Sequence, residues 1–276
     1  MLAANRKFLI IALLLVLALG LVSSSVMAKL AVAPLSLILE LKPGESTTKE
    51  LSIHNTGEEP IEVSVELMDW WRSPSGDLQV KQPDTLDRSC ADWVLYSPSS
   101  LSLQPGEREQ VSVELSVPND ATGDHWALLL ASEKPQPVEE EQPVTTRISI
   151  SYAIKILQKD PTNRVKEAKI TNIELNQSSP LKLTIAYENS GSAHLQTTGK
   201  VEIRDLQGET VKEIAIDKFP TLPGEKRDLT LEAEEDSEKL EPGDYYVIAT
   251  MDFGGDRLIQ GGLPIEIPKG EEEAED

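Results

Sequence analysis

The chain contains few cysteines, few histidines and few basic residues. It contains 276 residues but only one cysteine and three histidines. A single thiol cannot form an internal disulfide bond, so Cys90 is either a small core residue or pairs with another chain. Basic residues are scarce, because 26 Lys and Arg stand against 47 Asp and Glu, a net charge of −21. This excess argues against nucleic acid or anionic lipid as a partner. It leaves a soluble acidic surface, or an acidic face for a basic protein.

The sequence also lacks the motifs of common catalytic and metal sites. It has no HExxH, no Cys/His zinc spacing, no Walker loop and no nucleophile elbow. His54, His125 and His194 stand far apart in different contexts, and the acidic stretch Asp84–Asp92 lacks EF-hand spacing. We therefore expect no enzymatic activity, no cofactor, no metal and no small-molecule substrate. A hydrolase is the least favoured class, since no triad is visible.

Only one long apolar run occurs, and it lies at the N-terminus. Phe8–Val22 follows the basic residues Arg6 and Lys7 and precedes small residues that end at Ala28. This layout predicts a secretory signal peptide over residues 1–28. The alternative is an uncleaved anchor, although the run is shorter than the roughly 20 residues that a spanning helix needs. We expect an extracytoplasmic protein of the periplasm or cell envelope, in contact with a membrane only if this segment is retained.

Short alternating runs dominate the rest of the chain. From Leu30 onward, turn residues interrupt stretches in which every second residue is apolar. The clearest stretches are Leu35–Leu41, Leu51–Ile53, Ile61–Leu67 and Val111–Val117. This pattern predicts an all-β fold of immunoglobulin-like sandwiches. His125–Ala131 is an apolar run that predicts a strand buried on both faces. Helical candidates are confined to Ala121–Glu133 and Leu231–Leu240, and the second is polar nearly all round, which favours a loop with at most one helical turn.

Three landmarks recur in the same order in both halves of the chain. Each half has an Asn-x-Gly corner, a Pro-Gly-Glu corner and a Gly-Asp pair before an apolar run. The pairs are Asn55–Gly57 and Asn189–Gly191, Pro105–Glu107 and Pro223–Glu225, and Gly123-Asp124 and Gly243-Asp244. The repetition predicts two immunoglobulin-like domains in tandem, over residues 29–158 and 159–268. An acidic tail over residues 269–276 is expected to be disordered.

One stretch just before the second half has a regular two-residue period. In Arg147–Leu157, isoleucine or tyrosine occupies every second position, as a β-strand requires. The residues on this face are Ile148, Ile150, Tyr152, Ile154 and Ile156. The strand either completes its own sandwich or also pairs with another protein.

Several features of the first domain occur together in the order known from one protein family. They are KPGES at Lys42–Ser46, LSIHN at Leu51–Asn55, Trp70, WVLYSPSSLSLQPG at Trp93–Gly106, Val111-Ser112-Val113, and IKIL at Ile154–Leu157 before Lys159 and Pro161. In this order, residues 32–161 resemble the N-terminal domain of the periplasmic pilus-assembly chaperones of the PapD type.

The resemblance implies a function in protein binding. Chaperones of this family lend the last strand of their first domain to an incomplete exported subunit, as in other cases of strand addition. Ile148, Ile150, Tyr152 and Lys155 would then bind the partner, with Lys155 anchoring its C-terminal carboxylate. The alternative is ordinary core packing for the isoleucines and a solvated position for Lys155.

One departure from the family pattern concerns the first strand. The family pairs the anchoring Lys with an Arg there, but Leu39 occupies that position and Leu30–Leu41 has no Arg. The expectation is a distant, chaperone-like relative that pairs a partner chain with an edge strand. The alternative function is a structural or adhesive protein of the surface or envelope.

Overall fold

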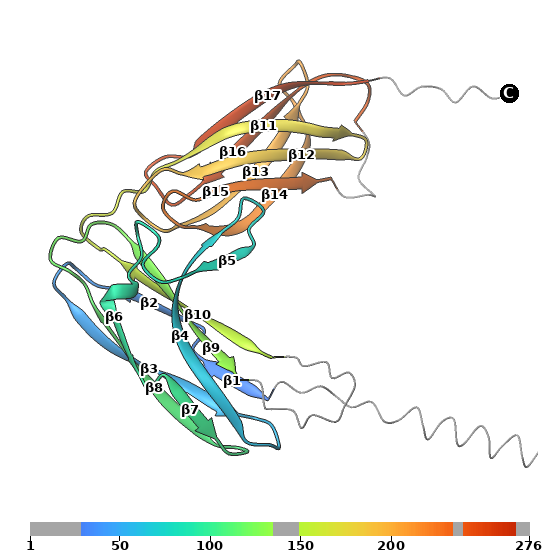
Figure 1. The fold of residues 1–276 in the computed structure, drawn as a ribbon. Helices are drawn as coiled ribbons and strands as arrows, with labels where there is room; N and C mark the ends of the chain where they lie inside the picture. Colours follow the sequence, from blue (N-terminus) through green and yellow to red (C-terminus); the bar gives the residue numbers. More distant parts are fainter. Residues whose placement is uncertain (1–28, 135–148, 234–239, 269–276) are drawn as a thin grey trace, which may run out of the picture.

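A computed structural model describes residues 29–134, 149–233 and 240–268. The predicted signal peptide, Ile148 and the acidic tail lie outside the described residues. Figure 1 shows two β-sandwiches, set at an angle and joined at one end. The predicted fold class, two immunoglobulin-like sandwiches in tandem, is confirmed.

The first sandwich is built from two sheets. One sheet has the order β1 (Leu30–Ala33), β3 (Ser46–Asn55), β8 (Arg108–Ser116) and β6 (Val94–Ser97). The other has the order β2 (Ser36–Glu40), β10 (Ser151–Lys159), β9 (His125–Glu133), β4 (Ile61–Arg72) and β5 (Leu78–Lys81), with β7 (Ser100–Leu103) also pairing with β4. The chain changes sheets between β1 and β2, which places β2 beside β10.

The core of the first sandwich follows from the alternation in its strands. In β4, Ile61, Val63 and Val65 are buried, while the residues between them face outward. Fully burying a side chain of this size contributes about 1.5–3 kcal/mol. Cys90 is completely buried in the same core and is a core residue, as one reading of the sequence predicted.

The second sandwich repeats the arrangement with seven strands. One sheet has the order β11 (Ala168–Ser178), β12 (Leu181–Asn189) and β15 (Lys226–Glu232), and the other has β14 (Thr210–Thr221), β13 (Leu195–Arg204), β16 (Gly243–Asp252) and β17 (Ile259–Ile267). Its core is formed by the same kind of alternation, with Leu183, Ile185 and Tyr187 of β12 buried.

The repeated corners have the same hydrogen bonds in both sandwiches. The Asn55 side-chain amide donates to the carbonyl of Glu59 at 2.8 Å, and the Asn189 amide donates to the carbonyl of Ala193, also four residues later, at 2.9 Å. Both asparagines are fully buried. The backbone of each also pairs with the glycine of the Pro-Gly-Glu corner. Each asparagine therefore satisfies backbone groups that the turn would otherwise leave unpaired.

Neither of the two helical candidates forms a helix in the described residues. The buried strand predicted at His125–Ala131 is confirmed, because His125–Glu133 forms β9. This strand lies between β10 and β4 and is covered on both faces, so its apolar run follows from burial and not from helical period. Within Leu231–Leu240, the described residues include the end of β15 and no helix. The described helix, the 3-10 turn Ala91–Trp93, is far too short to cross a membrane, and no longer apolar helix occurs in these ranges.

Candidate functional site

The alternating strand predicted at Arg147–Leu157 is β10, and it begins four residues later than expected, at Ser151. Along one side it pairs antiparallel with β9 over Ser151–Gln158. Along the other side it pairs parallel with β2, but only over Lys155–Lys159. Among the described residues, no strand lies beside the first half of β10 on the side away from β9.

The direction of the backbone groups in this first half follows from the ladder. The N–H of Glu133 donates to the carbonyl of Ile150. The backbone N–H and C=O groups of the even-numbered residues of β10 therefore point toward β9. The N–H of Lys155 donates to the carbonyl of Leu35 at 3.1 Å. The backbone N–H and C=O groups of the odd-numbered residues therefore point to the side away from β9. The N–H and C=O groups of Ser151 and Ala153 therefore point away from β9. We call these four groups the outer edge of β10.

The side chains predicted to bind a partner are divided between the core and the surface. The Tyr152 hydroxyl donates to the carbonyl of Leu30 at 2.8 Å, and its ring packs against the core of its own sandwich. Ile150 is half-buried just before the strand. The structure gives Tyr152 a packing role of its own, while a role for Ile148 and Ile150 in partner binding stays a prediction.

Lys155 lies on the opposite face of β10 and lines a cavity between the two sandwiches. This junction cavity has a volume of about 340 Å³ and is lined by residues of both domains, among them Leu35, Ile38, Trp70, Arg72, Lys155 and His194. The Lys155 ammonium is 5.2 Å from the centre of the Trp70 ring. Burial, with the nearby Arg72 charge, lowers the pKa of Lys155 from its ordinary value.

Arg72, the last residue of β4, brings a second positive charge to the junction cavity. Its guanidinium carbon is 5.0 Å from the centre of the same Trp70 ring. Its Nη1 lies 3.8 Å from the Glu225 carboxylate and, within the described part of the chain, is buried without a hydrogen bond. The positive charges of Lys155 and Arg72 repel each other beside the Trp70 ring. An anion in the cavity would be attracted to both charges and would reduce this repulsion.

The first strand adds no charge here. Leu39 is buried in the core of the first sandwich, whereas its neighbour Ile38 is 56% exposed and lines the junction cavity. The sequence comparison of the first strand assigned the missing Arg to Leu39, but a side chain at this position faces the core and not Lys155. It could not find Arg72, because this residue reaches the cavity from a different strand.

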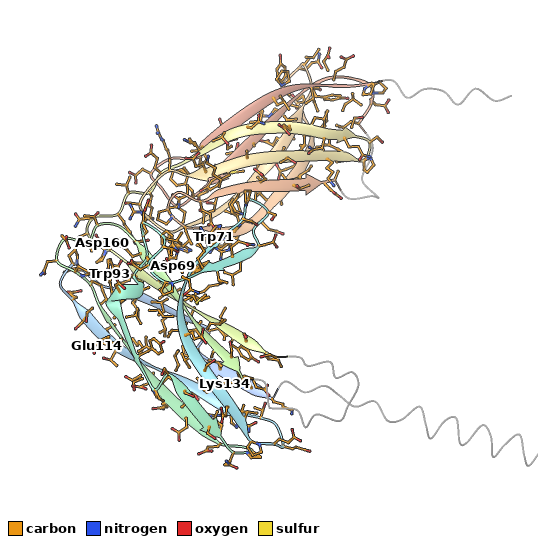
Figure 2. The ribbon with its side chains drawn as sticks, in the orientation of Figure 1. Asp69, Trp71, Trp93, Glu114, Lys134 and Asp160 are labelled. Atoms are coloured by element: carbon orange, nitrogen blue, oxygen red, sulfur yellow. The ribbon has the colours of Figure 1, made fainter. Side chains whose placement is uncertain are left out.

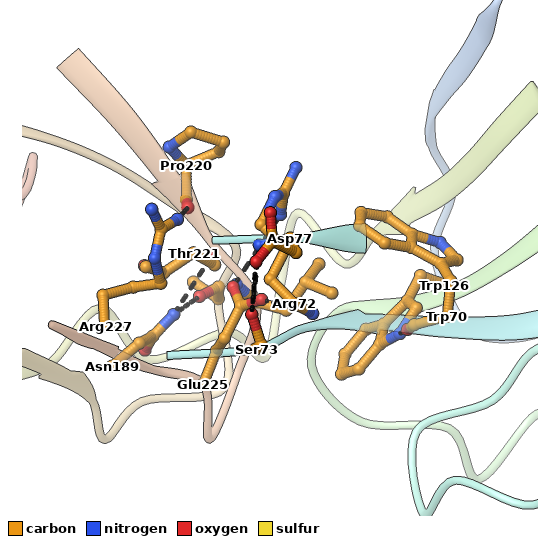
Figure 3. A network of polar contacts seen from close by, with 12 residues as sticks. Trp70, Arg72, Ser73, Asp77, Trp126, Asn189, Pro220, Thr221, Glu225 and Arg227 are labelled. Atoms are coloured by element: carbon orange, nitrogen blue, oxygen red, sulfur yellow. Dashed lines mark hydrogen bonds and ion pairs between the residues drawn. The ribbon is translucent and has the colours of Figure 1, made fainter. Parts of the chain in front are cut away.

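A tryptophan pair separates the junction cavity from the rest of the interface. The Trp126 indole N–H donates to the Trp70 carbonyl at 2.7 Å (Figure 3). The Trp70 indole N–H donates to the Ala127 carbonyl at 3.0 Å. Leu222 of the second sandwich packs into the same cluster. The first sandwich thus offers an apolar surface that the second covers.

The side of the junction near the linker is held by polar residues, with Asp160 lying where the sandwiches meet (Figure 2). The Asp124 carboxylate accepts the N–H of His194 at 2.7 Å and the N–H of Asp160 at 3.0 Å. Burial and the charges of Lys159, Arg72 and Arg164 lower the pKa of His194 to about 4. In the described residues, no group of His, Cys, Asp and Glu is arranged to hold a metal ion.

No protein-family model and no curated protein matches the chain. Among solved structures, the chain is similar to the class 5 fimbriae chaperone CfaA, with 13% identity over 86% of this chain and 98% of that one, at a TM-score of 0.46. A chaperone–tip adhesin complex of CFA/I fimbriae biogenesis matches at 15% identity over 88% and 100%, with a TM-score of 0.48.

A third similar structure comes from the archaic chaperone-usher Csu pili of Acinetobacter baumannii. It is the pre-assembly complex of CsuC with the tip adhesion subunit CsuE, and it matches at 12% identity over 88% of this chain and 100% of that one, with a TM-score of 0.46. In all three comparisons the sequence identity is 15% or lower and the TM-score is below 0.5.

Proposed function

We propose that this protein binds an exported protein partner in the manner of a chaperone, by adding a strand of the partner to the outer edge of β10. The single observation that carries this proposal is the outer edge, whose N–H and C=O groups at Ser151 and Ala153 pair with no strand among the described residues. Such an edge can pair with an extended chain through main-chain hydrogen bonds.

The position of β2 determines where a partner strand would end. β2 takes over the same side of β10 from Lys155 onward, so a strand paired with Ser151 and Ala153 stops at the junction cavity. A partner running parallel to β10 would bring its C-terminal carboxylate to this point, whereas an antiparallel partner would bring an ammonium group. Lys155 and Arg72 favour the carboxylate. The partner segment is therefore a C-terminal β-strand.

In this proposal, Arg72 supplies the positive charge that Leu39 does not. Lys155 and Arg72 lie about equally far from the Trp70 ring, at 5.2 and 5.0 Å. The exposed side chains of Leu35 and Ile38 line the cavity beside them and offer apolar contact to the last side chain of the partner.

Two peptides that differ only at the C-terminus test this function. An acetylated octapeptide of alternating Val and Thr would be titrated by calorimetry as its free acid and as its amide. We expect the acid to bind about tenfold more tightly, since a charge-assisted bond contributes about 1.4 kcal/mol or more. Lys155→Met should remove this preference. Equal binding of the acid and the amide by the wild-type chain would contradict the carboxylate anchor.

A second variant tests the strand pairing itself. Ala153→Pro removes an N–H that points outward, so it should leave the ladder with β9 intact while abolishing the binding of both peptides. Retention of peptide binding by a folded Ala153→Pro variant would contradict pairing at the outer edge.

The second candidate function is a structural or adhesive protein of the envelope. It is favoured by the hydrogen bonds between the two sandwiches, which involve backbone groups and carboxylates and would keep the domains in a fixed arrangement. Co-purification of the mature chain from its native envelope separates the two functions. A stoichiometric small subunit that is lost on changing both Ile148 and Ile150 to Asp supports strand addition, and retention of every partner supports the structural role.

A further inference from the structure

The Pro-Gly-Glu corner occurs in both sandwiches, but only one copy reaches the other domain. In the first sandwich, the Glu107 carboxylate accepts the N–H of Gln104 at 2.6 Å. In the second, the Glu225 carboxylate accepts the N–H of Leu222 at 2.7 Å in the same way. The other oxygen of Glu225 accepts the backbone N–H of Arg72 at 2.8 Å.

Glu225 is therefore shared between its own turn and the end of β4. It is nearly buried, at 7% exposure, and its second contact with Arg72 is the 3.8 Å ion pair with the guanidinium (Figure 3). Just beyond Arg72, the carbonyl of Pro74 accepts the N–H of Asp228 at 2.9 Å. The second domain thus fixes both the backbone and the side chain of a residue that belongs to the first.

We propose that Glu225 is a positioning residue for partner binding, which holds Arg72 against Trp70 so that its charge acts together with Lys155. The proposal rests on the function proposed above and extends it to the second domain. Glu225 contacts no partner atom in this arrangement. Its effect passes through the backbone N–H and the guanidinium of Arg72, and it makes carboxylate recognition in the first sandwich depend on the second.

The loss of the negative charge and the loss of the hydrogen bond to Arg72 predict opposite effects of Glu225→Gln on the affinity for a carboxylate. The variant removes a negative charge near Lys155 and Arg72, so electrostatics alone predicts stronger binding of a carboxylate. However, a Gln side chain has one acceptor oxygen and cannot accept the N–H groups of both Leu222 and Arg72 as the two carboxylate oxygens do. Loss of the bond to Arg72 would release this residue, and carboxylate binding should become weaker.

The test uses the same free-acid and amide octapeptides on the full mature chain. We expect Glu225→Gln to reduce the preference for the acid about three- to tenfold, while Glu107→Gln, the matched corner of the first sandwich, leaves it unchanged. If Glu225→Gln does not fold, Glu225→Asp replaces it. The shorter side chain keeps the negative charge but no longer spans the distance to Arg72, so the preference should fall again.

The outcomes separate this proposal from the function on which it rests. If the wild-type chain does not prefer the acid, the carboxylate anchor fails and the role of Glu225 fails with it. If the wild-type chain prefers the acid and Lys155→Met abolishes the preference, while the Glu225 variant keeps or increases it, only the role of Glu225 is overturned. A purely structural role would lower the melting temperature without reducing the preference for the acid.

Discussion

Individual residues give the junction cavity a positive character in a chain whose net charge is −21. Lys155 and Arg72 flank Trp70, and the partly buried imidazole of His194 lines the same cavity. Each of these three groups has a lowered pKa, and burial is the largest cause in every case. Lys155 and Arg72 therefore carry the positive charge of the cavity, whereas His194, with a pKa of about 4, is uncharged at neutral pH.

The His194 imidazole predicts a specific dependence of stability on pH. Its pKa is lowered from 6.5 to about 4 in the folded chain. Above pH 6.5 neither state binds the proton, so the contribution of His194 to the free energy of unfolding is fully present. Between 6.5 and about 4 only the unfolded chain takes up the proton, and this contribution is lost as the pH falls.

We expect the wild-type chain to lose about 2 kcal/mol more than His194→Gln between pH 7 and pH 4.5, allowing for solvent screening. Urea denaturation of both proteins at the two pH values measures the difference. Identical losses in the two proteins would show that His194 titrates normally in the folded chain.

The sequence could predict single residues only where their environment is local. Cys90 was predicted to be a small core residue because a single thiol has no internal disulfide partner, and the two-residue period of β10 already placed Lys155 opposite Ile154 and Ile156. The role of Arg72 depends on Glu225, which follows it by 153 residues. Nothing in the segment Asp69–Arg72 indicates that contact.

At the level of the elements, each sandwich depends on the same asparagine at one corner. Asn55 and Asn189 are buried, and each side-chain amide donates to two backbone carbonyls. Each also accepts the N–H of the glycine two residues later, at 2.9 and 3.1 Å. The turn therefore satisfies its polar groups through one side chain.

Replacing either asparagine by alanine leaves these backbone groups unpaired in the interior. We expect Asn55→Ala and Asn189→Ala each to lower the free energy of unfolding by about 2–4 kcal/mol. Chemical denaturation followed by tryptophan fluorescence measures Asn55→Ala, because all four tryptophans lie in the first sandwich, and far-UV circular dichroism measures Asn189→Ala in the second. A loss below about 0.5 kcal/mol in both variants would contradict this role of the corner.

A strand could be predicted from the sequence when one of its faces is buried and the other is exposed to solvent. Strands with one buried and one solvated face, such as β4 and β12, were visible as alternation. β9 is covered on both faces, so its continuous apolar run was open to a helical interpretation. β5 alternates apolar and polar residues over only four positions and is exposed throughout, so this short period predicts no buried face.

At the level of the whole molecule, two buried carboxylates join the sandwiches from opposite sides. Asp124 of the first sandwich accepts the N–H of His194 of the second, and Glu225 of the second accepts the N–H of Arg72 of the first. The N–H of Asp124 also donates to the carbonyl of Ser192 at 2.8 Å. These reciprocal contacts should hold the angle between the sandwiches, and with it the shape of the junction cavity.

Asp124→Ala removes one of these carboxylates at a residue that does not itself line the junction cavity. We expect residual dipolar couplings of the wild-type chain to fit one alignment tensor, whereas the variant should need a separate tensor for each sandwich. Asp120→Ala, at an exposed position in the same loop, serves as the control and should behave like the wild type. A single tensor for Asp124→Ala would show that the other contacts suffice to fix the angle.

Amide hydrogen exchange along β10 tests the free outer edge most directly. In the mature protein without a partner, the amides of Tyr152 and Ile154 should be protected by β9, while those of Ser151 and Ala153 exchange rapidly. Addition of the free-acid octapeptide should then slow exchange at Ser151 and Ala153. If these two amides are as protected as their neighbours before any partner is added, the edge is already occupied and strand addition at this site is excluded.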